Sequence, residues 1–350
     1  MAPHVAVIGA GIIGLSTAVL AQEKIPGLQV TIISEHFSPH TTGDGSAGLW
    51  MPYCLKDTPQ NKILRWSSKT YDHILKLWKS NEAGDVGISL IPVYKLTEKS
   101  GGEDMEQPEW TKVPLAHHII NSHQAQKLAS LSDSKFTGGT HCISFTLEPT
   151  YFLPYLMQKF KVNGGKVLHQ KVESLQQFCG QNYDVVINCT GVQAHNLVGD
   201  KSVQPVRGQV LRVNAPWVFH AALEGNEGNY IIPNKDNVIL GGTQQEGNWN
   251  TKPDPADSMS IHNGCCKLMP GLKEAVIVNE WAGLRPGRSE VRLERDHVRD
   301  KYGNKLEVIH NYGHGGSGVT LSWGCAHDVV NILKDILYSQ PSTVKLSSKL

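Results

Sequence analysis

The pattern of apolar positions in the first 35 residues predicts a strand, a helix and a second strand. Residues 4–8 (HVAVI) and 29–34 (QVTIIS) are short runs rich in β-branched side chains, which favours buried strands of a parallel sheet. Between them, residues 12–22 carry the apolar periodicity of a helix. The chain is therefore expected to open with part of an α/β domain.

The turn between the first strand and the helix carries the glycine pattern GAGIIG. Gly9 permits a tight turn, Gly11 lets the backbone approach a pyrophosphate, and Gly14 lets helix and strand pack closely. Glu35 follows the second strand, at the position where a ribose hydroxyl would be accepted. Strand, glycines, helix and acid occur in the required order, so an adenine dinucleotide site is favoured over an ordinary glycine turn.

A second glycine-rich loop precedes the last predicted helix, residues 319–337. Gly313, Gly315, Gly316 and Gly318 leave backbone amides accessible, and a helix N-terminus carries positive partial charge. A second anion site suits a cofactor that carries its pyrophosphate at the first glycine turn and develops negative charge at its opposite end. Reduced flavin meets that requirement and a nicotinamide does not.

The remaining patterns predict how the domains are organised. The apolar run 183–191 (YDVVINCTG) resembles the first strand and is placed in the same sheet, whereas the segments from VRGQVLRVNAPW to VILGGT alternate like antiparallel strands. We predict an α/β fold with a discontinuous Rossmann-like cofactor domain and an inserted, mainly antiparallel β substrate domain. The cofactor domain would comprise 1–50, 142–192 and 282–338, the substrate domain 51–141 and 193–281, and the tail 339–350.

Composition narrows the class of protein. The 350 residues are 40% hydrophobic, enough for a substantial core, and the formal net charge of +1 argues against a nucleic-acid surface. No segment approaches the roughly 20 apolar residues that span a bilayer, and the start lacks the layout of a signal peptide. We therefore expect a soluble intracellular protein without membrane insertion or nucleic-acid partner.

Cysteine and histidine spacings give no indication of a metal site. The seven cysteines include the adjacent pair Cys265 and Cys266 but no CxxC motif, which favours reduced, mostly buried thiols. His310 and His314 are close in sequence, but no carboxylate or cysteine lies nearby at ligand spacing. A structural role is preferred for both, and no metal is expected.

The last three residues predict a cellular location. Ser348, Lys349 and Leu350 form an SKL terminus, the address that the peroxisomal import receptor recognises. We expect the protein in the peroxisome matrix. Hydrogen peroxide is made and destroyed there, which favours an oxidase.

These motifs together resemble the D-amino-acid oxidase and D-aspartate oxidase family of FAD enzymes. The resemblance covers nearly the whole length and includes, in the family's order, VAVIGAGIIGLSTA, TTGDGSAGLWMPY, VVINCTG, PVRGQVLRVNAPW, YIIPN, VILGGT, GLRP, HNYGHGGSG and the SKL tail. It implies a discontinuous Rossmann-like FAD-binding domain, with FAD as cofactor and a D-amino acid and oxygen as small-molecule substrates. It leaves a homodimer open.

The resemblance assigns roles to four residues that contact the substrate. Arg285 would hold the substrate carboxylate, since a guanidinium presents two parallel donors, and its leucine and proline neighbours favour a buried turn. The hydroxyl of Tyr230 would meet the same carboxylate, and Tyr53 would line the pocket. The carbonyl of Gly316 would accept a hydrogen bond from the substrate amine.

The same resemblance assigns the residues that contact the cofactor. Thr320, at the start of the last helix, would bond the pyrimidine edge of the flavin. The full set is Gly9, Ala10, Gly11, Ile12, Gly14, Glu35, His36, Thr41, Thr42, Ala47, Gly48, Leu49, Val172, Thr190, Gly315, Gly318, Val319 and Thr320.

The implied reaction needs no catalytic acid–base pair from the protein. Flavin N5 can accept the α-hydrogen as hydride while the lone pair of the neutral amine drives the transfer, and the protein mainly orients the Cα–H bond. The imino acid would hydrolyse to a 2-oxo acid and ammonia, and oxygen would reoxidise the flavin to give hydrogen peroxide. Fixing both carboxylate and amine makes the site selective for one enantiomer.

Two positions favour neutral substrates. Oxidases for acidic D-amino acids carry arginines where this chain has Leu223 and Gln244, and an unpaired substrate carboxylate would cost several kcal/mol. The segment before Tyr230 is nevertheless short, as in the aspartate oxidases, and Asn226 replaces a lid tyrosine. The sequence does not place Arg288 relative to the pocket. Because its charge could pair with an acidic side chain, oxidation of acidic D-amino acids remains the alternative.

Three other functions share part of the pattern. A nicotinamide-dependent dehydrogenase would share the opening motif, but it would leave the distant glycine loop and the SKL tail unexplained. A non-catalytic flavin-binding protein would not require Arg285 and Tyr230. Oxidases of glycine or sarcosine match fewer of the motifs.

Overall fold

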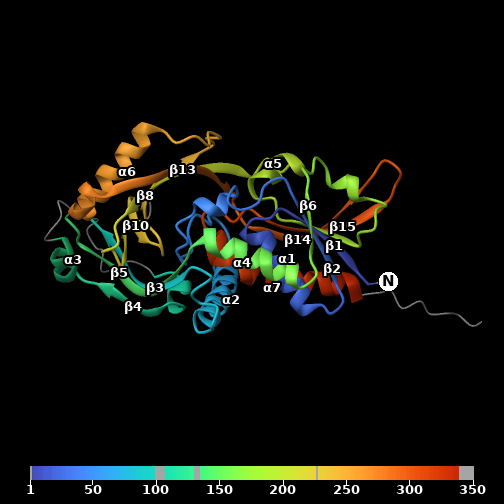
Figure 1. Ribbon diagram of the computed structural model, residues 1–350, viewed down its shortest axis with the longest axis horizontal. Coiled ribbons are helices and arrows are strands. Elements are labelled where there is room, and N and C mark those ends of the chain that lie inside the picture. The colour runs from blue at the N-terminus through green and yellow to red at the C-terminus, as the bar shows by residue number, and fades with distance from the viewer. Residues whose placement is uncertain (1, 99–106, 130–134, 226–227, 339–350) are drawn as a thin grey trace, which may run out of the picture.

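The computed structural model describes residues 2–98, 107–129, 135–225 and 228–338. Two lobes follow one another along the long axis, each built on its own sheet (Figure 1). The predicted SKL tail and Asn226 lie outside the described residues.

The first lobe contains a six-stranded sheet in the order β14-β15-β7-β1-β2-β6. All neighbours in it are parallel except β14 and β15. The strands predicted at 4–8 and 29–34 are confirmed. The strand predicted within 183–191 lies in the same sheet but spans only Val185–Asn188. The strands are β1 (His4–Ile8), β2 (Gln29–Ser34), β6 (Lys166–His169), β7 (Val185–Asn188), β14 (Arg292–Arg299) and β15 (Lys305–Tyr312).

Helices cover this sheet, because burying their apolar faces against its strands removes apolar surface from water. The first helix, α1 (Ile12–Lys24), packs against α7 (Gly318–Tyr338) and α4 (Pro149–Val162), and α2 (Gln60–Trp78) packs against α7. Their buried side chains form one core with strands β1 and β2. The other helical segments are α3 (Ser122–Ala129), α5 (Ala194–Leu197), α6 (Pro255–Leu268), η1 (Thr42–Gly45), η2 (Glu109–Lys112), η3 (Leu175–Phe178), η4 (Gly191–Gln193) and η5 (Pro270–Glu274).

The second lobe contains a nine-stranded sheet in the order β12-β8-β11-β10-β9-β3-β5-β4, with β13 also paired to β8. All pairs are antiparallel except β3 with β9, so the prediction of a mainly antiparallel domain is confirmed. The strands are β3 (Ile88–Thr97), β4 (Leu115–Ile120), β5 (Gly138–Leu147), β8 (Gln204–Asn214), β9 (Ala221–Glu224), β10 (Tyr230–Pro233), β11 (Val238–Gly241), β12 (Gln245–Glu246) and β13 (Val276–Gly287).

The predicted domain boundaries need correction in three places. Helix α2, predicted in the substrate domain at 51–141, packs against α7 in the first lobe. The boundaries at residues 142 and 282 fall inside β5 and β13, so 142–147 and 282–287 belong to the second sheet. Strand β13 pairs with β8 along its whole length, and these ladder bonds keep its end in that sheet. It extends from the second lobe toward the first (Figure 1).

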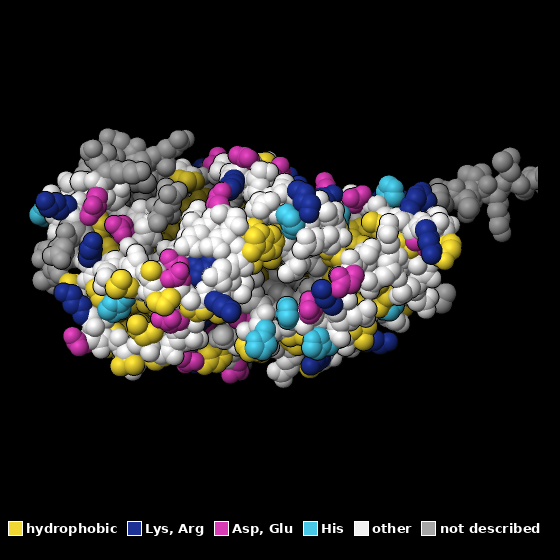
Figure 2. Space-filling model, turned by 90° about the horizontal axis from the view of Figure 1, so that it is seen from above, with side chains coloured by type: hydrophobic (Ala, Val, Ile, Leu, Met, Phe, Trp, Pro, Cys, Tyr) yellow, Lys and Arg dark blue, Asp and Glu magenta, His cyan; other side chains and the backbone are white. Residues whose placement is uncertain are grey.

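The surface matches the near-neutral composition. On the face shown in Figure 2, basic and acidic side chains are interspersed. Within the described ranges, no helix combines the length and apolarity that a bilayer crossing requires.

Candidate active site

A cavity of about 640 Å³ is lined by residues from both lobes. At one end are the turns that follow β1, β2 and β7, including Gly9, Glu35 and Thr190. At the other end are Tyr230 from β10 and Arg285 from β13. The carboxyl ends of parallel strands are the usual binding edge of an open α/β sheet, so the cavity connects a nucleotide-type edge to a second, polar end.

The glycines of the first turn have distinct structural roles. Gly9 has φ +105°, and a Cβ there would lie 2.6 Å from the carbonyl oxygen of Cys189. A Cβ on Gly14 would lie 2.0 Å from the carbonyl oxygen of Gly9, so this residue packs helix α1 onto the strand. A Cβ on Gly11 would meet no atom within 4 Å. Gly11 lies on the cavity wall, where it leaves space at the N-terminus of α1.

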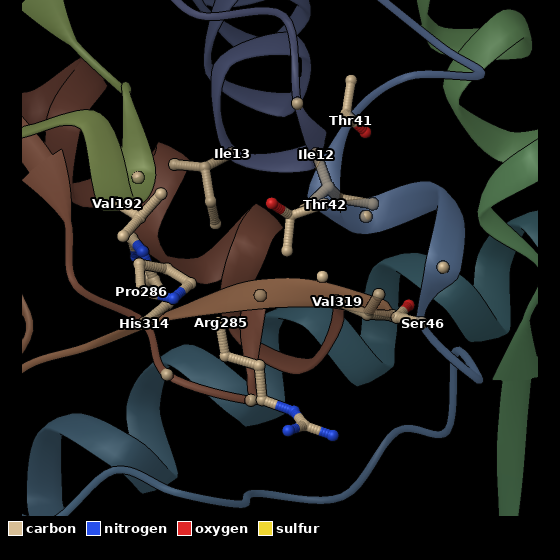
Figure 3. A pocket seen from close by; sticks show the side chains of 18 of the residues that line it. Ile12, Ile13, Thr41, Thr42, Ser46, Val192, Arg285, Pro286, His314 and Val319 are labelled. Carbon is tan, nitrogen blue, oxygen red and sulfur yellow. The ribbon is translucent and has the colours of Figure 1, made fainter. Parts of the chain in front are cut away.

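Most residues predicted to contact the cofactor lie on this wall. Gly14 and Thr320 are the two of the eighteen that do not line the cavity. The Thr320 hydroxyl donates to the Met51 carbonyl oxygen at 3.1 Å and accepts from the Met51 amide at 3.2 Å, and the flavin contact of this residue stays a prediction. In Figure 3, Ile12, Thr42 and Val319 surround the same space.

The N-terminus of α7 fixes the segment that carries Tyr53. The Ser317 hydroxyl accepts from the Tyr53 amide at 2.6 Å and donates to the Tyr53 carbonyl oxygen at 2.7 Å. Gly315 has φ +53°, and a Cβ on it would lie 2.0 Å from the carbonyl oxygen of Cys54. A Cβ on Gly316 would lie 2.3 Å from the Tyr53 ring. The glycine loop therefore packs directly on residues 53–54. The sequence contained no signal for the two hydrogen bonds of Ser317, because its partner lies far away along the chain.

Arg285 lies in strand β13, which corrects the predicted buried turn. Ladder pairing with Val206 of β8 continues through Arg285, so the proline that follows does not end the strand. Its Nη1 donates to the carbonyl oxygen of Thr243 at 3.0 Å. A Cβ on Gly208, in β8, would lie 2.3 Å from that Nη1, so a glycine is what leaves room for the guanidinium. Figure 3 shows the guanidinium extending from β13 away from the side of Ile12.

Tyr230 lies beside this arginine and depends on a second glycine. A Cβ on Gly241, its partner in β11, would lie 2.0 Å from the Tyr230 ring carbon Cζ. Burial raises the pKa of the Tyr230 hydroxyl, while the charge of Arg285 and its hydrogen bond oppose that rise. The tyrosine therefore stays protonated at neutral pH and can donate a hydrogen bond. Glycines inside strands signal close approach of another group, a sequence feature that could have identified Gly208 and Gly241.

The residues from which the preference for neutral or acidic substrates was predicted have different surroundings. Leu223 lines the cavity. Gln244 does not, and its Oε1 accepts a hydrogen bond from the Tyr53 hydroxyl. Arg288 also lies off the wall, where its Nε donates to Asp200 at 3.1 Å. Arg288 therefore does not supply a cation to the pocket, which corrects the hypothesis made from the sequence.

The arrangement can bind a small anion next to a dinucleotide. Arg285 and the protonated Tyr230 supply donors that suit a carboxylate, and the exposed backbone of Gly316 supplies a carbonyl on the same wall. Among the described residues, no group of three His, Cys, Asp or Glu side chains gathers as metal ligands. A dinucleotide-type cavity that ends in such donors is typical of an oxidoreductase for an anionic substrate.

Comparison with known proteins defines the family. A family model described as FAD dependent oxidoreductase matches residues 4–332, and the chain belongs to that family. It is 39% identical to a D-amino acid oxidase of Dugesia ryukyuensis, with 95% of this chain and 98% of the relative covered. It is 36% identical to the D-aspartate oxidase of Homo sapiens, with 99% and 98% covered.

A comparison of structures supports the same fold. The glycine oxidase of Bacillus cereus ATCC 14579 is 18% identical and superimposes with a TM-score of 0.77, with 97% of this chain and 96% of that chain covered. The family membership confirms FAD as the cofactor and sets aside a nicotinamide-dependent dehydrogenase.

Residues of the cavity fit FAD on physical grounds. The buried Nε2 of His314 and Oγ of Ser46 have no hydrogen-bond partner among the described residues, and both residues line the cavity. Burial lowers the pKa of His314 to about 3, so its ring is neutral and one nitrogen can accept a hydrogen bond. A polar cofactor can satisfy both atoms. The space beside Gly11 at the N-terminus of α1 suits the pyrophosphate.

Proposed function

We propose that this protein catalyses the oxidative deamination of D-amino acids to 2-oxo acids, with release of ammonia and hydrogen peroxide. The pairing of Arg285 with Tyr230 at one end of the FAD cavity carries the proposal, because these donors suit an α-carboxylate. The names of the relatives, D-amino acid oxidase and D-aspartate oxidase, support it.

The residues of this chain bind and orient the substrate. Arg285 and Tyr230 hold the α-carboxylate, and the carbonyl of Gly316 accepts from the amine, so that the Cα–H bond of one enantiomer faces the cofactor. Bound FAD would supply the acceptor for a hydride from Cα while the amine nitrogen gives up a proton, and the two electrons and two hydrogens would pass to oxygen as hydrogen peroxide. Water converts the released imino acid to the 2-oxo acid and ammonia.

Neutral D-amino acids are the preferred substrates. Leu223 presents an apolar side chain on the wall, and Gln244 is engaged by the Tyr53 hydroxyl. Arg288 is paired with Asp200 away from the cavity. Neither of the positions at which acidic-substrate oxidases carry arginine therefore supplies a cation here.

Peroxide release from the purified flavoprotein tests this function. We expect turnover of D-alanine and D-methionine and none of their L-enantiomers. Arg285→Ala should retain its flavin but lose about 100-fold or more in kcat/KM, since a charge-assisted bidentate contact is removed. A flavoprotein that oxidises no D-amino acid would refute the proposal, whereas a preference for D-aspartate would refute only its neutral part.

We further propose import into the peroxisome matrix through the SKL terminus. The proposal rests on the last three residues of the sequence. A fluorescent fusion with a free SKL terminus should collect in peroxisomes, and removal of Ser348, Lys349 and Leu350 should leave it in the cytosol. Equal distribution of both fusions would contradict the proposal.

A homodimer is the proposed assembly. Trp217, Phe219, Val276 and Val278 are large exposed apolar residues, and the start of β13 pairs with the end of β8 at Asn214. Exposed apolar side chains on neighbouring segments support a contact between two copies, because monomers rarely expose large apolar patches. Light scattering should give twice the mass of the chain. In the double variant Phe219→Ser, Val276→Ser, the measured mass should fall to that of a single chain.

A further inference from the structure

Strand β13 presents a tryptophan, a glycine and an arginine on one face. Side chains alternate along a strand, so Trp281, Gly283 and Arg285 project to the same side. All three residues line the cavity. A Cβ on Gly283 would lie 2.0 Å from the Trp281 ring carbon Cη2, so the indole extends over this glycine in the direction of Arg285.

The indole also covers a segment of the first lobe that lines the cofactor cavity. A Cβ on Gly45, the last residue of η1, would lie 2.1 Å from both Cδ2 and Cε2 of Trp281, so this glycine packs against the face of the ring. Thr42 and Ser46, on either side of Gly45, line the cavity (Figure 3). The hydroxyl oxygen of Ser46 is buried without a partner among the described residues. The position of this segment therefore matters for cofactor binding.

A second residue of the same sheet holds this segment by a hydrogen bond. Val210 of β8 pairs with Trp281, and Arg212 lies two positions further along the same face of β8. Arg212 is buried, and its Nη2 donates to the carbonyl oxygen of Asp44 at 2.9 Å. The Asp44 carboxylate accepts from the amide and the hydroxyl of Thr41 at 2.8 and 2.7 Å. The second sheet thus holds η1 by one polar and one aromatic contact.

Part of the indole remains open to the cavity. Trp281 is only half-buried although its ring packs against two glycines, and it lines the cavity. An aromatic ring offers a large, rigid contact area and loses little conformational freedom when another group packs on it. Trp281 can therefore contribute to cofactor binding through η1 and through its own surface.

We propose that Trp281 is a positioning residue for FAD, which fixes residues 42–46 against the second sheet and forms part of the cavity wall with the uncovered side of its indole. Gly45 and Gly283 leave the room that the ring needs. The inference requires FAD as the cofactor, which the family match confirms, and it does not depend on which substrate is oxidised.

A double-mutant cycle between Trp281 and Gly45 tests the contact. Trp281→Ala removes the indole, whereas Gly45→Ala places a methyl group where the ring lies. Each substitution should weaken FAD binding about tenfold or more, measured from the flavin fluorescence that appears on dilution of the holoenzyme. In the double variant the methyl group has space, so Gly45→Ala should add less than about twofold to the effect of Trp281→Ala.

The visible circular dichroism of bound FAD adds a readout that a purely structural role would not move. The spectrum of fully loaded Trp281→Ala should differ from that of the wild type, because the groups around the flavin determine it. Trp281→Phe should recover much of the FAD affinity, since it keeps an aromatic ring. Trp249→Ala is the matched control, because this tryptophan is exposed and lies off the cavity wall, and it should change neither measurement.

The outcomes separate this inference from the proposed function. A wild-type FAD affinity in either single variant, or effects that add in the double variant, would refute the contact's role in FAD binding. Gly45→Ala keeps the indole and so provides the test if Trp281→Ala does not fold. An unchanged spectrum in loaded Trp281→Ala would refute the contribution of the indole to the cavity wall. Peroxide release tests D-amino-acid oxidation separately, so that proposal stands or fails by its own measurement.

Discussion

At the scale of single residues, two glycines inside strands create the space in which the substrate-binding side chains lie. Gly208 leaves room for the guanidinium of Arg285, and Gly241 leaves room for the ring of Tyr230. A glycine in a strand interior weakens the strand, so its presence here reflects the approach of another group. The binding geometry therefore depends on residues that contribute no side chain.

We predict that Gly241→Ala displaces Tyr230 and impairs activity. The added Cβ would lie 2.0 Å from the ring carbon Cζ, so the tyrosine must move. Because displacement of a substrate-positioning group by about 1 Å can cost about 100-fold, kcat/KM for D-methionine should fall by that order. Steady-state kinetics with flavin content checked would measure it.

Gly84→Ala is the matched control, since a Cβ there meets no atom within 4 Å. Its kinetics should equal those of the wild type. Wild-type kinetics in Gly241→Ala would show that the ring adapts without loss, which would contradict the assigned function of Gly241.

At the scale of elements, the N-terminus of α7 connects the two lobes at the active site. Hydroxyls of Ser317 and Thr320 hold the backbone of Tyr53 and Met51 through paired hydrogen bonds. Tyr53 in turn donates to Gln244 near the second sheet. The helix start thus positions a wall of the cavity in addition to presenting its amides.

We predict that Ser317→Ala loosens this connection. Both backbone groups of Tyr53 lose their partner, so the free energy of unfolding should fall by about 1–3 kcal/mol. KM should rise because Tyr53 is less well positioned, with a smaller effect on kcat. Urea unfolding and steady-state kinetics would measure the two effects.

Ser322→Ala is the control, because the Ser322 hydroxyl donates only to the Val319 carbonyl within α7. It should leave KM unchanged. A Ser317→Ala protein with reduced stability but an unaltered KM would show that the hydrogen bonds support folding alone.

At the scale of the whole molecule, buried neutral histidines make stability depend on pH. Burial lowers the pKa of His73 and His314 to about 3 and that of His310 to about 4. Their pKa in the unfolded chain is near 6.5, so below that pH the unfolded state binds more protons. Each therefore supplies stability that is present at pH 7 and is lost progressively as the pH falls toward the folded value.

We predict that the free energy of unfolding decreases between pH 6.5 and 4. The loss approaches about 1.4 kcal/mol per pH unit for each of the three histidines. Urea unfolding of the flavoprotein at several pH values would measure the slope. In His73→Phe, an aromatic ring can remain stacked on Trp323 without titrating, so the slope should decrease by up to about 1.4 kcal/mol per pH unit.

Exposed His123 provides the comparison, since His123→Gln should leave the slope unchanged. A stability that is constant from pH 6.5 to 4 would contradict the assignment of neutral buried histidines.

The sequence by itself determined the features that depend on neighbouring residues. The first strand, its glycine turn and helix α1 were predicted nearly to the residue, because apolar periodicity and glycine conformation act over short stretches. The long final helix and the antiparallel block were predicted for the same reason. The motifs also indicated the family and FAD, which the family match confirms.

Only the tertiary structure decided how distant residues meet. Lys95, Leu223 and Tyr230 are separated by up to 135 positions in the chain, yet strand register places them in one row. The strand position of Arg285, the domain boundaries inside β5 and β13, and the pairing of Arg288 with Asp200 were likewise fixed by partners far away in sequence. Alternation along a strand shows which residues share a face, but a neighbouring strand's identity and register arise from packing of the whole chain.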